Sequence, residues 1–522
     1  MIEDLTKILK KNKNILIIIS VALIIFLGIA IRLYKINSIP PGLYGDVAAN
    51  GIDSLSILDG NFRAQYWRNG GREGMFYYIV AFLMLFTKEY FVMYLATAAI
   101  GSTTLIVNWF VIKDWLGKKI ALISTFLMSF SFFHIHYSRL GYRTILTPLI
   151  VLTVFYFMRK MLEKKDIKYS ILAGFFAGLG IYTYLSYRGF LIGAVLSLGY
   201  FLFWNRKILK EYTKRILVFF ASAIITAIPF ILSAIEDPVT AFGRSQSVSA
   251  EGSLIENVIK TLKVFGIKGD PEVQYNVPEM PVISLLLTGF LILGLIWLLK
   301  KKFKSFEMPF VLLTIGSHLA IVAITDRIPH MLRAVGITAF IFTLVAIGIV
   351  WIYKFFENNE ELGRYKNYLK YGFAACMILY FITIPISAYN NYFNVWAKTE
   401  NIDRLEFFTD YIALGHYLEK FSKEELKEVR VVANWYVSET ETRKDSYVLQ
   451  TADYILMDDP QIFQVDYLDS MSTDNKGIYI LKYDDIRGIE KFNELFPEAG
   501  QTDAIYSEKD PEFLLFRVYD LR

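Results

Sequence analysis

Long apolar runs separated by short polar segments fill most of residues 14–389. A helix needs about 20 apolar residues to cross the hydrocarbon core of a membrane. By that measure the pattern predicts about eleven spans, at residues 14–33, 90–112, 120–137, 144–158, 169–187, 189–205, 216–235, 280–299, 308–325, 334–353 and 371–389. The run 74–87 is apolar but short, so its assignment depends on the charges around it.

Five segments between the predicted spans are basic and together carry 21 Lys and Arg against 8 Asp and Glu. They are residues 113–119, 159–168, 206–215, 300–307 and 354–370. Cytoplasmic loops favour Lys and Arg, and all five fall on that side only if 74–87 does not cross the membrane. We therefore expect 74–87 to form an interfacial or half-buried helix. The N-terminus is then cytoplasmic, and the C-terminal region lies on the other side.

The composition agrees with an integral cell-membrane protein, because 54% of the 522 residues are hydrophobic. Its basic excess sits in short loops, which argues against nucleic acid as a partner. Residues 398–522 instead hold 27 acidic against 15 basic side chains. They read as an α/β fold, with helices near 403–420 and 485–496 and strands within 427–435, 477–483 and 513–519.

The predicted architecture is therefore a polytopic α-helical membrane domain over residues 1–389, followed by a small extracytoplasmic α/β domain over residues 390–522. The outer side carries two long loops, 34–73 and 236–279. Long loops between spans usually carry function. We interpret the tail as a packing or acceptor-binding lid, since it contains no nucleophile motif and no metal-ligand spacing.

In the first long loop, Asp46 stands just where the chain leaves the membrane. Residues 46–58 have helical character, which puts Asp53 on the same helix face as Asp46. Asp46 is open to three interpretations: a general base, a metal ligand, or an N-cap, since Asp before a helical run is a common start signal.

The end of the same loop reads RNGGREG at residues 68–74. Two glycines and two arginines, among them Arg72, suit an anion, because backbone N–H groups and guanidinium donors can both face it. The alternative is a tight turn with arginines that reach to the interface. Glu73 is unusual at the start of an apolar helix; it is open to assignment as a helix cap, a ligand of a divalent metal ion or a partner of a sugar hydroxyl.

Further cations gather in short outer turns, against the usual charge bias. The turn FHIHYSRLGYRTILTP (133–148) holds two histidines, Tyr137, Arg139 and Arg143, and its His-x-His spacing is weak evidence for zinc. Arg188 lies between two spans, and TDRIPHMLRAVG (325–336) contributes His330 and Arg333. Ionisable groups at membrane depth are costly, so this pattern indicates a site for a phosphate-bearing substrate at the outer surface; a bound lipid headgroup is the alternative.

Taken in order, these motifs resemble the GT-C superfamily of polyprenyl-phosphate-sugar glycosyltransferases. The chain is most similar to family 39, which is related to protein O-mannosyltransferases and to lipid A aminoarabinose transferases. The similar stretches run along nearly the whole chain: PPGLYGDVAANGIDSL, RNGGREGMFYY, FHIHYSRLGYRTILTPL, GLGIYTYLSYRG, FGIKGDPEVQYNVPEMPV, DRIPHMLRAVG and DPEFLLFRVY.

The resemblance implies roles for particular residues. Asp46 matches the acidic residue that acts as general base in the family, and Glu73 matches a carboxylate near the metal or the donor. Arg139 falls in a Ser-Arg pair, and His330 and Arg333 match a polar helix start by the donor phosphate. Relatives usually carry Glu directly after the first-loop Asp, where this chain has Val47. Any role of that Glu would pass to Asp53 or be lost, which leaves metal dependence open.

The resemblance also implies the reaction: transfer of a sugar from a polyprenyl monophosphate to an acceptor hydroxyl, with inversion. Asp46 is then the base; Arg139, Arg143, Arg188, His330 and Arg333 hold the donor, with support from Asp53, Arg72, Glu73 and Tyr137. No organic cofactor is expected, and the acceptor is an unknown glycan, lipid or protein. Two alternatives stay open: a flippase for lipid-linked saccharides, or a non-catalytic lipid-binding scaffold. Val47, in place of the usual Glu, favours the scaffold. Polar residues at the outer ends of spans and the lack of an evident repeat disfavour the flippase.

Overall fold

The structure is a computed structural model, and it describes residues 13–164, 166–206, 209–246, 252–432, 449–457, 463–466 and 471–522. The chain forms two compact units. Unit 1 comprises Met1–Ile36, Arg63–Phe76 and Tyr94–Lys398, and unit 2 comprises Asn37–Phe62, Tyr77–Met93 and Thr399–Arg522. The division predicted from sequence, 1–389 and 390–522, stays a prediction, and each unit is described by itself below.

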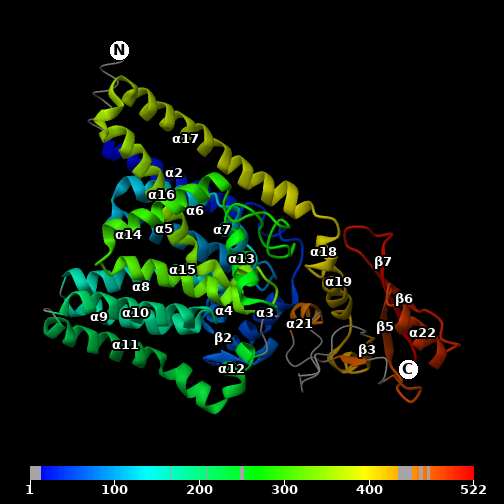
Figure 1. Ribbon diagram of the computed structural model, residues 1–522. Coiled ribbons are helices and arrows are strands. Elements are labelled where there is room, and N and C mark those ends of the chain that lie inside the picture. The colour runs from blue at the N-terminus through cyan, green and yellow to red at the C-terminus, as the bar shows by residue number, and fades with distance from the viewer. Residues whose placement is uncertain are drawn as a thin grey trace. The chain divides into compact units, whose positions relative to one another are not determined.

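Unit 1 is a bundle of helices (Figure 1). Its main helices are α2 (Lys13–Leu33), α5 (Val92–Leu116), α6 (Lys118–Ser129), α7 (Phe132–Tyr137), α8 (Leu146–Lys164), α9 (Ile167–Leu179), α10 (Tyr187–Trp204), α11 (Leu209–Glu236), α12 (Pro238–Gln246), α13 (Leu254–Lys263), α14 (Leu285–Lys302), α15 (Glu307–Ile324), α16 (Thr338–Asn358) and α17 (Lys366–Tyr389). Helix α9 packs against α8 and α11, and α16 packs against α6, α14 and α17.

Within the described ranges, eight helices are long and apolar enough to cross a membrane. They are α2, α5, α8, α10, α11, α15, α16 and α17, some extended by adjoining 3-10 turns. The predicted polytopic helical architecture is therefore confirmed. Three of the eleven expected spans fall short of this measure. Helices α6 and α9 have 12 and 13 residues, about 20 Å at 1.5 Å per residue, and three lysines end the 18-residue α14.

Residues 74–87 do form a short helix, α4 (Met75–Met84). Its 10 residues span about 15 Å, half of the hydrocarbon thickness. It is thus too short to cross, as predicted, and its position at the interface stays a prediction.

Charges at one end of the bundle join segments that the charge rule placed on one side. Near the end of α8, Arg159 contacts Asp114 at 2.6 Å and Glu307 at 3.4 Å, and Lys302 lies 3.7 Å from Glu307. These residues come from three of the five basic segments. Arg143 precedes the other end of α8, so the predicted outer and inner groups lie at opposite ends of that helix.

In unit 2, the C-terminal part folds as a five-stranded mixed sheet with the order β4-β3-β5-β7-β6. The strands are β3 (Val429–Val432), β4 (Gln464–Asp466), β5 (Ile478–Lys482), β6 (Asp503–Tyr506) and β7 (Leu514–Asp520); the helices are α18 (Ile402–Leu405), α19 (Thr409–Leu418), α20 (Lys423–Leu426), α21 (Gln450–Leu456) and α22 (Ile486–Leu495). Strand β3 is parallel to β4 and β5, whereas β7 is antiparallel to β5 and β6. The predicted α/β tail is confirmed, and residues 433–435 of its first expected strand lie outside the described residues.

Unit 2 also holds α3 (Gly45–Leu58) from the first long loop. Helix α3 packs against α21. The Leu43 N–H donates to the Phe407 carbonyl at 2.7 Å, and the Thr451 hydroxyl donates to the Leu43 carbonyl at 3.0 Å. A Cβ on Gly51 would lie 2.5 Å from the Tyr454 ring, so the close contact between α3 and α21 requires glycine there. The segment that carries Asp46 is therefore fixed by the tail.

Candidate functional site

Glu73 and two arginines form a buried ionic cluster in unit 1, which we call the arginine cluster. Glu73 ends the short strand β2 (Arg72–Glu73), Arg143 opens the 3-10 helix η2 (Arg143–Ile145), and Arg188 is in the first turn of α10. The Arg143 Nε donates to Glu73 Oε2 at 3.1 Å, and the Arg188 Nη2 donates to Glu73 Oε1 at 3.4 Å. Glu73 and Arg143 are 3% and 5% exposed, so this cluster lies in a poorly hydrated environment.

Aromatic rings and one carbonyl hold the two guanidinium groups in place. That of Arg143 lies 5.3 Å from the centre of the Tyr184 ring. That of Arg188 lies 5.2 Å from the Phe230 ring and 5.5 Å from the Phe242 ring, and its Nη1 donates to the Ala241 carbonyl at 3.0 Å. Two guanidinium groups against one carboxylate leave one formal positive charge. A preorganised, excess positive charge of this kind suits an anion such as a phosphate.

The surroundings of Glu73 do not suit a metal ion, because each of its oxygens already faces a guanidinium group. The two histidines of the 133–148 turn point to different partners. The His134 Nδ1 lies 2.7 Å from Arg32 Nη2, and the His136 Nε2 donates to the Gln274 carbonyl at 3.0 Å. In the part of the chain that the structure describes, no three His, Cys, Asp or Glu side chains gather in a way that could hold a metal ion.

The turn that precedes Glu73 explains its glycines. Asn69, Gly70 and Gly71 all have positive φ, at 50°, 81° and 91°. A Cβ on Gly71 would lie 2.0 Å from the Thr240 carbonyl oxygen, so no side chain fits there. These observations favour the tight-turn interpretation of RNGG. Arg72 is buried within this short hairpin.

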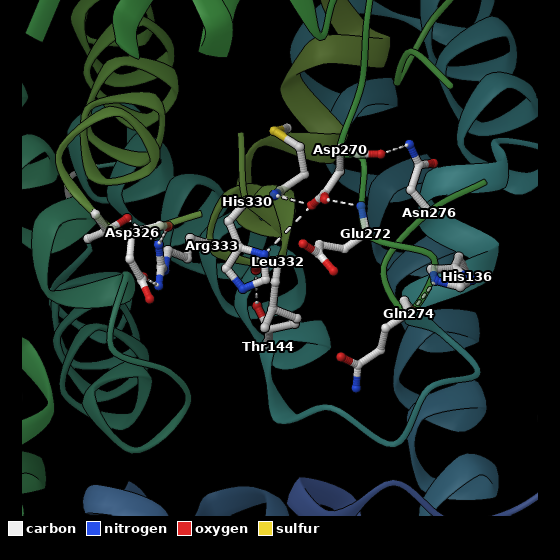
Figure 2. A network of polar contacts seen from close by, with 12 residues as sticks. His136, Thr144, Asp270, Glu272, Gln274, Asn276, Asp326, His330, Leu332 and Arg333 are labelled. Carbon is white, nitrogen blue, oxygen red and sulfur yellow. Dashed lines mark hydrogen bonds and ion pairs between the residues drawn. The ribbon is translucent and has the colours of Figure 1, made fainter. Parts of the chain in front are cut away.

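A second polar centre in unit 1 is built around Asp270, in the segment between α13 and α14 (Figure 2). Its carboxylate accepts the Glu272 N–H on Oδ1 at 3.1 Å and the Met331 N–H on Oδ2 at 3.1 Å. The same Oδ2 lies 3.6 Å from the His330 Nδ1. Asp270 thus ties this segment to the start of the 3-10 helix η5 (Met331–Ile337), which leads into α16.

Side chains from distant parts of unit 1 form hydrogen bonds with the rest of the segment between α13 and α14. His136 binds the Gln274 carbonyl, and the Trp396 Nε1 donates to the Val273 carbonyl at 2.7 Å. The Asn276 Nδ2 donates to the Asp270 carbonyl at 3.0 Å and to the Met280 carbonyl at 2.7 Å. This loop is held chiefly by contacts to its backbone, so its course is well defined without regular secondary structure.

The Tyr275 ring packs edge-on against His330, with 4.5 Å between ring centres. Burial lowers the pKa of His330 more than the neighbouring Asp270 raises it, and Arg333 and Arg327 lower it further. The imidazole is therefore neutral at neutral pH. Sequence reasoning missed Asp270 and Tyr275, although the stretch FGIKGDPEVQYNVPEMPV that contains them was the signal available.

Two arginines assigned to the donor have other partners. Arg333 binds the Asp326 carboxylate at 2.5 Å and the Asp326 carbonyl at 2.8 Å, within its own turn. Arg139 donates to the carbonyls of Ile31, Arg32 and Tyr34, at 3.0, 2.6 and 2.8 Å. Arg139 thus caps the C-terminal end of α2, whose last carbonyls lack intrahelical partners. For both arginines, binding of the donor phosphate stays a prediction.

We expect Arg139→Met to destabilise the fold by about 1–3 kcal/mol, because the buried Arg32 carbonyl and the part-buried Ile31 and Tyr34 carbonyls lose their donor. The melting temperature of the purified protein in detergent measures this. Arg139→Lys keeps the charge but cannot reach all three carbonyls. Its melting temperature should therefore lie between those of Arg139→Met and the wild type. A loss of polyprenyl-phosphate affinity at an unchanged melting temperature would contradict this assignment and return Arg139 to the donor.

Asp46 and Asp53 belong to unit 2. Helix α3 starts at Gly45 with Tyr44 as its N-cap, so Asp46 lies in the first turn and is not the cap. Asp46 is half-buried, Asp53 is buried, and Val47 is completely buried in an apolar position. A carboxylate at position 47 would lose its hydration there, which is consistent with the valine found at this position.

Residues 74–232 match a family model described as dolichyl-phosphate-mannose-protein mannosyltransferase. This segment is similar to the PMT_2 family, and the match spans less than a third of the chain. A comparison with curated protein sequences gave no match. The resemblance predicted from the sequence motifs is thereby confirmed.

Solved structures of similar fold extend over nearly the whole chain. ArnT from Cupriavidus metallidurans bound to undecaprenyl phosphate gives a TM-score of 0.61 at 10% identity, over 97% of this chain and 98% of that one. Archaeal oligosaccharyltransferase AglB from Archaeoglobus fulgidus, in complex with an inhibitory peptide and a dolichol-phosphate, gives 0.53 at 13% identity, over 90% and 70%. At these identities the likeness shows the fold alone, and the predicted multi-span helical fold with a small C-terminal α/β part is confirmed.

Proposed function

We propose that this protein transfers a sugar from a polyprenyl monophosphate to an acceptor hydroxyl on the outer face of the membrane, with inversion. The observation that carries the proposal is the family match over residues 74–232, a segment that includes Arg143 and Arg188. The similar fold of a protein crystallised with undecaprenyl phosphate supports it. The arginine cluster supplies an anion-binding group that the donor requires.

In the proposed reaction, Asp46 accepts the proton of the acceptor hydroxyl as its oxygen attacks the anomeric carbon of the sugar. The bond between that carbon and the phosphate oxygen breaks on the opposite face, and its electron pair stays with the lipid phosphate. The leaving group gains negative charge and needs no proton. Arg143 and Arg188 would stabilise this charge, which is the interaction that lowers the barrier most in such transfers.

The proposal excludes a role for Glu73 as a metal ligand and gives it a different one. A buried carboxylate between two guanidinium groups fixes their positions and keeps them from carrying two unbalanced charges. One net positive charge remains on the cluster, and the donor phosphate would neutralise it on binding.

The test is transfer of label from radiolabelled polyprenyl-phosphoryl sugars, in membranes that contain or lack the protein. We expect label in an acceptor fraction only where the protein is present. A flippase would instead move the labelled lipid across proteoliposome membranes without changing it. A non-catalytic scaffold would bind the lipid and leave all label on it, and either result would contradict the proposal.

A further inference from the structure

The hydroxyl of Tyr137 is a completely buried polar group that makes no hydrogen bond within the described residues. Tyr137 ends α7, and the ionisable groups around its hydroxyl are Asp270, Tyr275 and Tyr184. Burial raises its pKa well above the usual value, and these three neighbours raise it further, so the group is a neutral hydroxyl. A buried hydroxyl without a partner is unfavourable and requires an explanation, such as a ligand that supplies the partner.

His330 presents a second unused polar atom in the same neighbourhood. Its Nδ1 lies 3.6 Å from Asp270 Oδ2, beyond hydrogen-bond distance, and is a buried nitrogen without a hydrogen-bond partner within the described ranges. Asp270 and Tyr275 both lie against His330, and α7 packs against η5, which follows His330. His136, the residue before Tyr137, binds the carbonyl of Gln274, the residue before Tyr275, so the two unused groups lie in one part of unit 1.

The chemistry of these two groups selects a hydroxyl over a phosphate. Both groups are neutral, so neither offers the positive charge that favours a phosphate. A sugar hydroxyl both donates and accepts, so one can bond the His330 imidazole and another the Tyr137 hydroxyl. Tyr184 connects this cluster to the anion site, because its ring packs under the Arg143 guanidinium and also neighbours Tyr137.

We propose that Tyr137 and His330 bind hydroxyl groups of the donor's sugar, next to the arginine cluster that takes its phosphate. This inference rests on the proposed function and deepens it, because it names the residues that distinguish a sugar-bearing lipid from the bare lipid phosphate. It also changes the expectation for His330, from a phosphate ligand to a sugar ligand.

The experiment compares the affinity of the purified full-length protein for undecaprenyl phosphate and for the same lipid carrying mannose, glucose or galactose. Tyr137→Phe and His330→Gln are each expected to weaken binding of the preferred sugar-bearing lipid about fivefold to tenfold, the effect of one lost hydrogen bond. Binding of bare undecaprenyl phosphate should stay within about twofold of wild type. The ratio of the two affinities is the readout.

Tyr187→Phe is the matched control, because the Tyr187 hydroxyl donates to the Ala177 carbonyl at 3.1 Å, away from this cluster. It should lower the melting temperature and leave the affinity ratio unchanged. Tyr137→Phe should not lower the melting temperature, since it removes an unsatisfied buried hydroxyl, but it should change the affinity ratio. The inference is overturned if the wild type binds bare and sugar-bearing lipids equally, or if both variants keep the wild-type ratio. Absence of sugar transfer by a wild type that still shows the ratio would instead count against the proposed function alone.

Discussion

Asp46→Asn is expected to abolish sugar transfer while the protein remains folded and still binds the polyprenyl-phosphate donor. Asparagine has nearly the same shape as aspartate but cannot take a proton from the acceptor hydroxyl. Loss of a general base typically lowers the rate by about 10²- to 10⁴-fold. The measurement is the initial rate of transfer at saturating donor, together with donor affinity and melting temperature.

The position of Asp46 leaves the helix cap intact in this variant. Asp46 lies in the first turn of α3 without serving as its N-cap, and Asn weakens its favourable interaction with the helix dipole, about 0.3–1 kcal/mol. Asp59→Asn is the matched control, because Asp59 is the exposed C-cap of the same helix. That variant should keep the wild-type rate. If Asp46→Asn retained near-normal turnover, Asp46 would lose the base role, and Asp53 on the same helix would become the next carboxylate to test.

Much of the architecture could be predicted because it depends on local composition. The apolar runs, the charge bias of short loops and the strand-like runs of the tail are properties of short segments, and most of them correspond to observed elements. The exceptions are informative. Helices α6 and α9 were expected to be full spans, but a non-helical step after Ser129 and a 3-10 turn after Leu179 end them early. Apolar composition alone does not reveal such an end.

The partners of polar residues could not be predicted, because they come from distant parts of the chain. The Ser-Arg pair drew attention to Arg139, yet the carbonyls it caps lie more than 100 residues earlier. Asp270 binds the Met331 N–H across 61 residues. The sequence predicts that buried charges need partners, and only the fold decides whether the partner is a backbone group, a counter-charge or a substrate.

The arginine cluster yields the second large expected effect. Glu73→Gln leaves the buried Arg143 guanidinium and the half-buried Arg188 guanidinium without a counter-charge and is expected to cost about 3–5 kcal/mol of stability. Arg143→Gln removes one of the two cations and is expected to weaken binding of bare polyprenyl phosphate about tenfold to a hundredfold, the effect of a lost hydrogen bond to a charged group. Melting temperature and lipid affinity measure the two effects separately.

The double variant Glu73→Gln with Arg143→Gln distinguishes the structural role of the cluster from its role toward the donor. It restores the formal charge of the cluster to that of the wild type, so stability should recover in part relative to Glu73→Gln alone. Affinity for the lipid phosphate should stay as low as in Arg143→Gln, because only Arg188 remains. Arg159→Gln, at the opposite end of α8, is the control: it should lower stability through its pairs with Asp114 and Glu307 and leave lipid affinity unchanged.

If Glu73 were a metal ligand instead, Glu73→Gln would have the same effect on stability as removing divalent cations with a chelator. The double variant would then recover no stability. The two interpretations thus predict different stabilities for the double variant. In one, Glu73 is the partner of an arginine of the protein; in the other, it is the partner of a metal ion from solution.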